Sequence, residues 1–353
     1  MRSPELLLPT NARAAVRDAA ASDPAAAVAA TPMPLDRQLR TAALASVAMA
    51  VPERVVTNAT VAEHAGVTEQ WIVHRTGVHE RRHVSEGERL QDLATAAGRQ
   101  ALDNAGVEPK DVDLVLVATL AADELTPNAA PLVAHDLGAV KAGAMDVGSA
   151  CTGFLSGLQL AAAQVEGGRA DNVLLIGADV LSRYIDRTDR GTAALFADGA
   201  GAAVVAPAGE GQGRIGDILL RCDGSGKDSI KAGDQERIIH MQGHDTFKSA
   251  VLRMSEATLA SVERAGLELD EIDLFVYHQA NARILTAVGD KLGLDEAKVV
   301  NSIDRYGNTS SATLPIALAD ARERGLLQPG MNVLLSAFGA GFTWGAGVIE
   351  WAA

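Results

Sequence analysis

Short, continuous apolar runs alternate with helical stretches along most of this chain. Residues 114–117 read Leu-Val-Leu-Val and residues 173–176 read Val-Leu-Leu-Ile, with no polar residue at every second position. Runs of this kind are typical of strands that are buried on both faces. The apolar stretch from Thr152 to about Val165 is long enough for a helix. The pattern therefore predicts sheets covered by helices, as in α/β proteins.

The same landmarks recur in the two halves of the chain at an offset of about 160 residues. Val112-Asp113-Leu114 follows an Ala-Gly pair in the first half, and Ile272-Asp273-Leu274 follows the same pair in the second. Farther on, Asn172-Val173-Leu174-Leu175 recurs as Asn332-Val333-Leu334-Leu335. Such self-similarity predicts an internally duplicated α/β fold with mixed sheets.

We expect three segments along the chain. Residues 1–40 are rich in Ala and Pro and are interrupted by charges, so they lack the apolar region of a signal peptide and predict a poorly ordered tail. A transit sequence or a start codon placed too early are alternatives. The N-terminal half spans residues 41–207 and the C-terminal half residues 208–353. No later stretch has about 18 apolar residues free of charge, so we expect no membrane span.

Composition narrows the possible partners. Apolar residues make up 48% of the 353 residues, which excludes a disordered or collagen-like chain. The formal net charge of -14 disfavours binding to nucleic acid or to an anionic membrane, so an anionic partner must bind a local basic patch. The two cysteines are too few for a disulfide scaffold and lack zinc-site spacing. We therefore expect a cytoplasmic protein in a reducing compartment.

Cys151 is the first candidate for catalysis. It ends the small-residue turn Gly148-Ser149-Ala150 and directly precedes the apolar helical stretch. The partial positive charge of a helix N-terminus stabilises a thiolate, so this position predicts a lowered thiol pKa and a nucleophile. A small buried core cysteine is the alternative interpretation. Cys222 lies in a Cys-Asp-Gly turn with no helix behind it and is the weaker candidate.

His278 and Asn308 lie in places where α/β proteins carry their chemistry. His278 follows the predicted strand of residues 274–277, and Asn308 lies in a turn that the repeat pairs with the Cys151 turn, Gly307 matching Gly148. Either residue alone is more often a structural hydrogen-bonding group. A Cys, a His and an Asn at strand–helix turns of one duplicated core together indicate cysteine nucleophilic catalysis.

A glycine string suggests a nucleotide site that its context contradicts. Gly211, Gly213 and Gly216 have the spacing of a dinucleotide-binding loop. Such a loop must open a helix, whereas the residues that follow, 217–220, read as a strand. We predict a turn here.

Two histidine pairs have a spacing that could suit a metal on a helix. They are His79 with His83 and His240 with His244. Charged neighbours in the first pair and Gly243 in the second argue against a metal-binding helix. We predict solvated loop histidines.

Four longer strings resemble the thiolase-fold condensing enzymes, and most closely the β-ketoacyl-acyl carrier protein synthase III family. They are Gly-Ser-Ala-Cys151-Thr-Gly-Phe, His278-Gln-Ala-Asn-Ala-Arg283-Ile, Tyr-Gly307-Asn308-Thr-Ser310 and Phe338-Gly-Ala340-Gly-Phe-Thr-Trp-Gly345. The resemblance runs from about residue 41 to the C-terminus and includes residues 189–192 and 195–201. It implies a layered α-β-α-β-α arrangement and a homodimer.

The resemblance also implies roles for the three candidate residues. Cys151 would take a starter acyl group from acyl-CoA, while His278 and Asn308 would hold the thioester carbonyl of a malonyl group on an acyl carrier protein. Neutral N–H donors at these positions would stabilise the enolate that decarboxylation leaves. The backbone N–H groups of Cys151 and Ala340 match a second oxyanion hole. No metal or cofactor is implied, because acyl-CoA and malonyl-carrier protein are substrates.

Further matches concern substrate binding. Trp71, Arg75 and Arg190 match positions that clamp coenzyme A, for which an aromatic face and guanidinium groups are chemically suited. Lys248 and Arg283 match positions that bind phosphopantetheine and the acidic carrier protein, and they would supply the local basic patch. Ordinary surface charge is the alternative interpretation for each of them.

Thr126 departs from the family pattern. Many relatives carry a phenylalanine there, which crosses the dimer interface and closes the partner's acyl pocket. The smaller threonine predicts a roomier channel that accepts branched, longer or bulkier starters than acetyl.

The leading hypothesis is an initiating ketosynthase of fatty-acid synthesis or polyketide priming. A family member that performs plain acyl transfer is the first alternative, although Asn308 would then be unnecessary. A thiolase would need a second catalytic cysteine near the C-terminus, and residues 338–345 contain none. An inactive partner subunit would be expected to lack Cys151.

Overall fold

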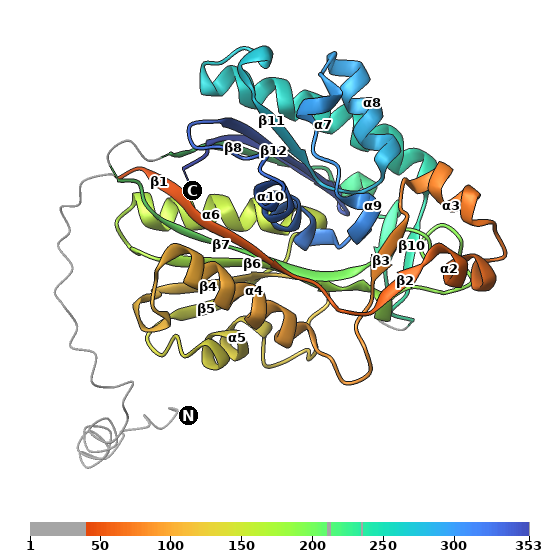
Figure 1. The fold of residues 1–353 in the computed structure, drawn as a ribbon, viewed down its shortest axis with the longest axis horizontal. Helices are drawn as coiled ribbons and strands as arrows, with labels where there is room; N and C mark the ends of the chain where they lie inside the picture. Colours follow the sequence, from red (N-terminus) through yellow and green to blue (C-terminus); the bar gives the residue numbers. More distant parts are fainter. Residues whose placement is uncertain (1–39, 210–212, 234–235, 353) are drawn as a thin grey trace, which may run out of the picture. The chain divides into compact units, whose positions relative to one another are not determined.

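The computed structural model describes residues 40–209, 213–233 and 236–352 (Figure 1). The first strand, β1, begins at Ala42. The predicted N-terminal tail, residues 1–40, therefore lies outside the described residues except for Arg40.

The N-terminal half forms a five-stranded sheet with the order β1-β7-β6-β4-β5. Its strands are β1 (Ala42–Ala50), β4 (Leu114–Ala118), β5 (Gly143–Val147), β6 (Val173–Val180) and β7 (Asp198–Pro207). β4 pairs in parallel with β5 and β6, whereas β7 pairs antiparallel with β6 and β1. Every residue of β6 is buried, as the continuous apolar run of this strand predicts.

The C-terminal half forms a four-stranded sheet with the order β11-β12-β13-β8. Its strands are β8 (Ile215–Cys222), β11 (Leu274–Tyr277), β12 (Asn332–Gly339) and β13 (Thr343–Glu350). β11 and β12 are parallel, and the other pairings are antiparallel. Read from β11 to β8, this order and these directions repeat those of β4, β6, β7 and β1, which confirms the predicted duplication.

The repeated sequence landmarks form the same contact in each half. Asp113 accepts a hydrogen bond from the backbone N–H of Asn172 at 3.1 Å, and Asp273 accepts one from the backbone N–H of Asn332 at 2.9 Å. The aspartate before one strand thus holds the start of the parallel neighbouring strand. Because this contact sets the strand register, the same pair of residue types recurs in both halves.

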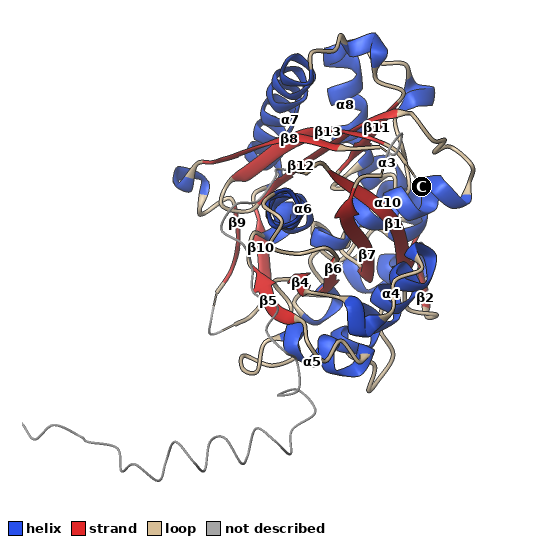
Figure 2. Ribbon diagram, turned by 90° about the vertical axis from the view of Figure 1, so that its left-hand side faces the viewer, coloured by secondary structure: helices blue, strands red, loops and turns tan. Residues whose placement is uncertain are grey.

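Helices and sheets alternate in five layers (Figure 2). The helices α4 (Leu90–Ala105) and α5 (Ala129–Leu137) cover the outer face of the five-stranded sheet. The helices α6 (Gly153–Glu166) and α10 (Thr313–Glu323) lie between the sheets, while α7 (Gly243–Ala265) and α8 (Ala282–Leu292) cover the outer face of the other sheet. The predicted α-β-α-β-α arrangement is confirmed.

The central helix α10 is largely apolar because its surroundings enclose it, whereas α6 keeps an exposed side at Gln159 and Leu160. In α10, every residue from Thr313 to Ala321 is buried, including Asp320. A helix that is buried all round needs small and apolar residues on every face. The small and apolar residues of α10 follow from this packing.

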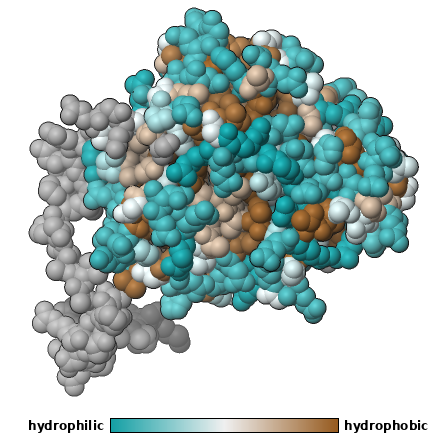
Figure 3. Space-filling view, viewed as in Figure 1, coloured by the Kyte–Doolittle hydropathy of each residue, from teal (hydrophilic) through white to brown (hydrophobic). Residues whose placement is uncertain are grey.

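Shorter elements complete the fold. They are β2 (Val55–Thr57), α2 (Asn58–Ala65), α3 (Glu69–Thr76), β3 (Glu80–Arg82), β9 (Ile230–Ala232), β10 (Ile239–Met241) and α9 (Ile303–Tyr306). Hydrophilic residues dominate the face seen in Figure 3, with small apolar groups between them. Within the described ranges, we find no helix with the length and apolar character needed to cross a bilayer.

The structure also tests the weaker sequence patterns. Gly211 lies outside the described residues. The strand predicted over residues 217–220 is part of β8 (Ile215–Cys222), but Gly216 lies in this strand too, so the predicted turn is wrong at that glycine. β3 separates His79 from His83, and His240 lies in β10 while His244 lies in α7, so neither pair shares a helix. No cluster of three or more metal-ligating side chains occurs in the part of the chain that is described.

The histidine prediction is wrong in two details. His240 lies in a strand and His244 in a helix rather than in loops. His83 is half-buried rather than solvated, and its Nε2 lies 3.4 Å from the carbonyl oxygen of Phe196. Burial lowers the pKa of this imidazole, against the opposing charge of Asp198. The sequence shows no such partner, because Phe196 is more than a hundred residues away.

Candidate active site

A cavity of about 1230 Å³ opens between elements of both halves. All of the predicted site residues except Thr126 line it: Trp71, Arg75, Cys151, Arg190, Lys248, His278, Arg283, Asn308 and Ala340. Residues that are far apart in the sequence are thus brought to the lining of one cavity. A cavity with convergent polar groups is the expected form of a small-molecule site.

Cys151 lies in a single 3₁₀ turn, Ala150–Thr152, which leads directly into α6. Its backbone packs closely against the end of β12. A Cβ atom built on Gly339 would lie 3.0 Å from both the Cβ and the backbone nitrogen of Cys151. Only glycine permits this approach, which places the following residue, Ala340, beside the thiol.

The pKa of the Cys151 thiol differs from the sequence-based prediction. Burial raises this pKa to about 11, because a thiolate loses its hydration in the closed site. The hydroxyl of Ser310 and the backbone N–H groups of Cys151 and Ala340 act in the opposite direction but do not outweigh burial. The position at a helix start is confirmed, and the predicted lowering of the pKa is wrong.

His278 follows β11 and is held by two contacts. Its backbone N–H donates to the carbonyl of Ser336 in β12 at 2.8 Å. Its Nδ1 lies 2.6 Å from Oγ1 of Thr313, the first residue of α10. Nε2 is therefore the ring nitrogen left to face the cavity. Burial lowers the pKa of His278 to about 3, so the imidazole is neutral near neutral pH.

Asn308 follows a tight turn at Gly307, whose φ of 67° lies in the left-handed region. The backbone N–H of Asn308 donates to Leu195 at 2.9 Å. Its side-chain Oδ1 accepts the backbone N–H of Ser310 at 2.9 Å, which fixes the carboxamide. Nδ2 then points toward the loop that carries His278, where it lies 3.4 Å from the carbonyl of Ala280. The amide donor and the imidazole thus belong to one side of the cavity.

The two pseudo-symmetric turns share an unusual backbone conformation. Ala150 has a φ of 43° and Ser310 a φ of 53°, and both are non-glycine residues in the left-handed region. Backbone strain of this kind is concentrated at functional sites. The turns meet where Oγ of Ser310 lies 3.5 Å from Sγ of Cys151. Sequence reasoning missed this contact and the Thr313 contact, although the match of Gly148 with Gly307 also pairs Cys151 with Ser310.

The predicted coenzyme A residues form an aromatic and cationic group. The guanidinium carbons of Arg75 and Arg190 lie 6.0 and 5.6 Å from the centroid of the Trp71 ring. Thr68 caps α3 by accepting the backbone N–H of Trp71 at 3.1 Å. Asp189 accepts the backbone N–H of Gly191 at 2.9 Å and so shapes the turn of Arg190. An aromatic face flanked by guanidinium groups suits a nucleotide with phosphates.

Further cations line the cavity from the C-terminal half. Lys248 in α7 and Arg283 in α8 are both exposed, and Arg283 stacks over Phe247 with its guanidinium carbon 5.6 Å from the ring centroid. Lys231 lines the same cavity and was missed in the sequence. The local basic patch expected from the net charge of -14 is therefore present around this cavity.

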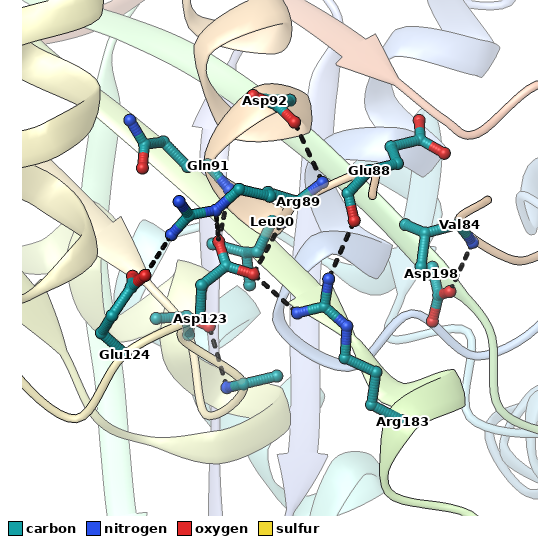
Figure 4. Close-up of polar contacts among 12 residues, drawn as sticks. Val84, Glu88, Arg89, Leu90, Gln91, Asp92, Asp123, Glu124, Arg183 and Asp198 are labelled. Atoms are coloured by element: carbon teal, nitrogen blue, oxygen red, sulfur yellow. Dashed lines mark hydrogen bonds and ion pairs between the residues drawn. The ribbon is translucent and has the colours of Figure 1, made fainter. Parts of the chain in front are cut away.

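Thr126 lies apart from this cavity, exposed on the loop between β4 and α5. Asp123 anchors the loop (Figure 4). Its carboxylate accepts hydrogen bonds from Arg183 at 2.6 Å and from the backbone N–H groups of Leu90 and Gln91 at 3.2 and 3.0 Å. The loop is thereby fixed to the start of α4 and to the segment after β6.

Comparison with known sequences gives consistent matches. The family described as 3-oxoacyl-[acyl-carrier-protein] synthase III matches residues 145–224, and its C-terminal part matches residues 262–351. A β-ketoacyl-[acyl-carrier-protein] synthase III of Listeria welshimeri is 42% identical over 301 residues, which cover 85% of this chain and 96% of that protein. A protein of the same name from Nitratidesulfovibrio vulgaris is 42% identical over 315 residues, with the same coverage.

Solved structures agree with the sequence matches. The 3-oxoacyl-[acyl-carrier-protein] synthase III of Aquifex aeolicus is 37% identical and superposes with a TM-score of 0.85, covering 88% of this chain and all of that one. The priming β-ketosynthase of the R1128 polyketide pathway is 34% identical with a TM-score of 0.87, covering 91% of this chain and 99% of its own. With identities this high over nearly the full length of its relatives, the chain belongs to the β-ketoacyl-[acyl-carrier-protein] synthase III family.

Proposed function

We propose that this protein is an initiating ketosynthase, which condenses an acyl-CoA starter with malonyl-acyl carrier protein in fatty-acid synthesis or polyketide priming. The observation that carries the proposal is the convergence of Cys151, His278 and Asn308 on one cavity bordered by cations. The names of the synthase and priming ketosynthase relatives support the same reaction.

In the first half-reaction, Sγ of Cys151 attacks the thioester carbonyl of acyl-CoA. Trp71, Arg75 and Arg190 would hold the nucleotide end of coenzyme A. The backbone N–H groups of Cys151 and Ala340 both act on Sγ, so a carbonyl oxygen bound beside this sulfur would receive two hydrogen bonds as it becomes an oxyanion. The products are an acyl-enzyme thioester and free coenzyme A.

In the second half-reaction, the malonyl thioester loses carbon dioxide and leaves an enolate. The neutral imidazole of His278 and the amide of Asn308 would donate hydrogen bonds to its oxygen. A neutral donor suits this role, because burial keeps the pKa of His278 far below neutral pH. The enolate carbon then attacks the acyl carbonyl on Cys151 and expels the Cys151 thiolate, which takes a proton from solvent as the β-ketoacyl product leaves.

The alternatives are less well supported. Plain acyl transfer needs no decarboxylation site, whereas Asn308 is present and its amide is oriented by Ser310. A thiolase would use a second cysteine in the loop after β12, and residues 340–342 contain none. A catalytically inactive subunit would have no need of Cys151 at the cavity.

We further propose a cytoplasmic homodimer. β5 is an edge strand of the five-stranded sheet, and Met145 on it is 51% exposed. Leu125, on the loop that carries Thr126, is 98% exposed. An unpaired edge with exposed apolar side chains is normally covered. A second copy of this chain would cover it and bring Thr126 to its partner's acyl channel, where threonine leaves room for starters bulkier than acetyl.

The proposed reaction needs no metal or cofactor. The thiol, the imidazole, the amide and the backbone N–H groups supply every step, and carbon–carbon bond formation is driven by loss of carbon dioxide. Acyl-CoA and malonyl-carrier protein enter as substrates.

Intact-mass spectrometry of the wild type and Cys151→Ala with a panel of acyl-CoAs tests the proposal. We expect acylation of the wild type alone, followed by discharge into a β-ketoacyl product and carbon dioxide when malonyl-carrier protein is added. Discharge without decarboxylation would establish an acyltransferase instead. Absence of acylation by any donor would point to an inactive subunit, and acylation by acetyl-CoA alone would refute the roomier channel.

A further inference from the structure

Asp179 is a fully buried carboxyl group close to the nucleophile that the proposed reaction does not use. It lies near the end of β6 and has no exposed surface. Its Oδ1 accepts hydrogen bonds from the backbone N–H of Leu120 at 2.9 Å and from the hydroxyl of Thr119 at 3.1 Å. Its Oδ2 accepts the backbone N–H of Ser311 at 3.0 Å. A buried carboxylate is costly, so its presence beside a thiol calls for a reason.

Ser310 connects this carboxyl group to Cys151. Its Oγ lies 3.5 Å from Sγ of Cys151, within hydrogen-bonding distance of a sulfur atom. The same side chain interacts with Asp179, where it favours the charged form of the carboxyl group. The negative charge of Asp179 in turn acts on the thiol of Cys151. The Ser310 hydroxyl therefore lies between the sulfur and the carboxyl group and interacts with both.

The surroundings of Asp179 suit both of its protonation states. The hydroxyl of Ser311 lies 2.7 Å from Oδ2 and 2.8 Å from the carbonyl oxygen of Ala118. A hydroxyl has one hydrogen, so it cannot donate fully to both acceptors. When Oδ2 carries a proton, it can donate to Ser311, whose own hydrogen then goes to Ala118. Three donors stabilise the ionised carboxylate, and the Ser311 hydroxyl can accept a hydrogen bond from the protonated form. Asp179 can therefore take up and release a proton.

We propose that Ser310 and Asp179 form a proton relay that removes the thiol proton of Cys151 as the acyl-enzyme forms. The S–H bond of Cys151 breaks and its proton passes to Oγ of Ser310, while the hydroxyl hydrogen of Ser310 passes to Asp179. The electron pair stays on sulfur, which attacks the acyl-CoA carbonyl. When the bond to coenzyme A breaks, its thiolate recovers the proton from Asp179 through Ser310. The relay rests on the proposed function, because it presupposes acylation of Cys151.

Electrostatics favours this route over direct ionisation of the thiol. Burial raises the pKa of Cys151 to about 11, so a thiolate rarely forms alone at neutral pH. Burial also raises the pKa of Asp179, which makes its carboxylate a better proton acceptor than an exposed one. Transfer between the two moves one negative charge within the site rather than creating a second. His278 is a poor acceptor by comparison, since burial holds its pKa at about 3.

Rapid-quench acylation of Cys151, followed by intact-mass spectrometry, tests the relay. The variants are Ser310→Ala and Asp179→Asn, with Thr119→Val as the control, because Thr119 bonds the same carboxylate but is absent from the cavity lining. We expect the maximal acylation rate to fall about 100-fold in both relay variants, the usual contribution of a positioned proton acceptor. The acyl-CoA concentration for half-maximal rate should stay within about 3-fold, as should the rate of Thr119→Val.

A second measurement separates proton transfer from a general loss of structure. Each variant is acylated to completion over a long incubation and then mixed with malonyl-carrier protein. Because this step requires no thiol proton to be removed, we expect product formation within about 3-fold of the wild type. The relay is overturned if Ser310→Ala is acylated at the wild-type rate, if Thr119→Val loses as much as Ser310→Ala, or if both steps slow equally. A wild type that is not acylated at all would overturn the proposed function as well.

Discussion

The hydrogen bond between Thr313 and His278 leads to the most specific prediction about the condensation step. The Thr313 hydroxyl lies 2.6 Å from Nδ1 of His278 and 2.9 Å from the carbonyl oxygen of Ser310. That carbonyl already accepts the backbone N–H of Thr313. A carbonyl oxygen can accept two hydrogen bonds, so the hydroxyl can donate either to Ser310 or to Nδ1. We predict that its hydrogen goes to Nδ1 when the enolate forms, which leaves Nε2 as the N–H that faces the cavity. In that arrangement, Thr313 holds His278 in the tautomer that can donate to an enolate oxygen.

Thr313→Val keeps the shape of the side chain and removes the hydroxyl. Both residues are buried, with 2% of Thr313 and 1% of His278 exposed, so water cannot easily replace the lost partner. An unsatisfied buried acceptor costs about 1–3 kcal/mol. In the tautomer with Nε2–H, the unprotonated Nδ1 is the acceptor that loses its donor. This tautomer therefore becomes less favourable by the same amount. One factor of ten in rate corresponds to about 1.4 kcal/mol, so condensation should slow about 5- to 150-fold.

The assay compares the two half-reactions. Cys151 is acylated to completion, and the release of β-ketoacyl product from malonyl-carrier protein is followed in a single turnover. We expect Thr313→Val to slow this step by the stated factor and to leave the acylation rate within about 3-fold, whereas Thr313→Ser should restore condensation. Condensation by Thr313→Val at the wild-type rate would refute the assigned tautomer, and equal slowing of both half-reactions would indicate a packing defect.

Three further predictions concern packing, substrate binding and pH. Gly177→Ala should lower the free energy of unfolding by about 1–3 kcal/mol, because the added Cβ would lie 2.5 Å from the carbonyl oxygen of Ser311. Thermal denaturation checks this loss against the control Gly143→Ala, whose added Cβ would have its nearest neighbour at 3.6 Å. Trp71→Ala should raise the KM for acyl-CoA about 10-fold through loss of the stacking face. The KM for an acyl-pantetheine thioester, which lacks the nucleotide, should stay unchanged. An equal rise in KM for both donors would contradict a role in nucleotide binding. Burial raises the pKa of Asp123, but hydrogen bonds from Arg183, Gln91 and Leu90 outweigh it and hold this pKa below its usual value. The stabilisation by Asp123 should therefore be complete at neutral pH and disappear as the pH falls through the lowered pKa, so the Tm difference between wild type and Asp123→Asn should shrink in acid; a constant difference would exclude the charge as its cause.

The sequence by itself determined the architecture to a large extent. Continuous apolar runs marked the buried strands, and the recurrence of an aspartate before one strand and an asparagine before the next revealed the duplication. This succeeded because the same hydrogen bond sets the strand register at Asp113 and at Asp273, so the requirement is written locally in each half. The position of Cys151 at a helix start could be predicted because the small-residue turn and the apolar stretch after it are also local patterns.

Only the tertiary structure decided how the site residues act on one another. The pKa of Cys151 depends on how completely other segments remove water from it, and no local pattern records that burial. The contacts of Ser310 with Cys151 and of Thr313 with His278 join residues 159 and 35 positions apart. Asp179 reads in the sequence as one polar residue near the end of an apolar run. Its proximity to the thiol exists only because the turn at Ser310–Ala312 packs against both β6 and the Cys151 turn.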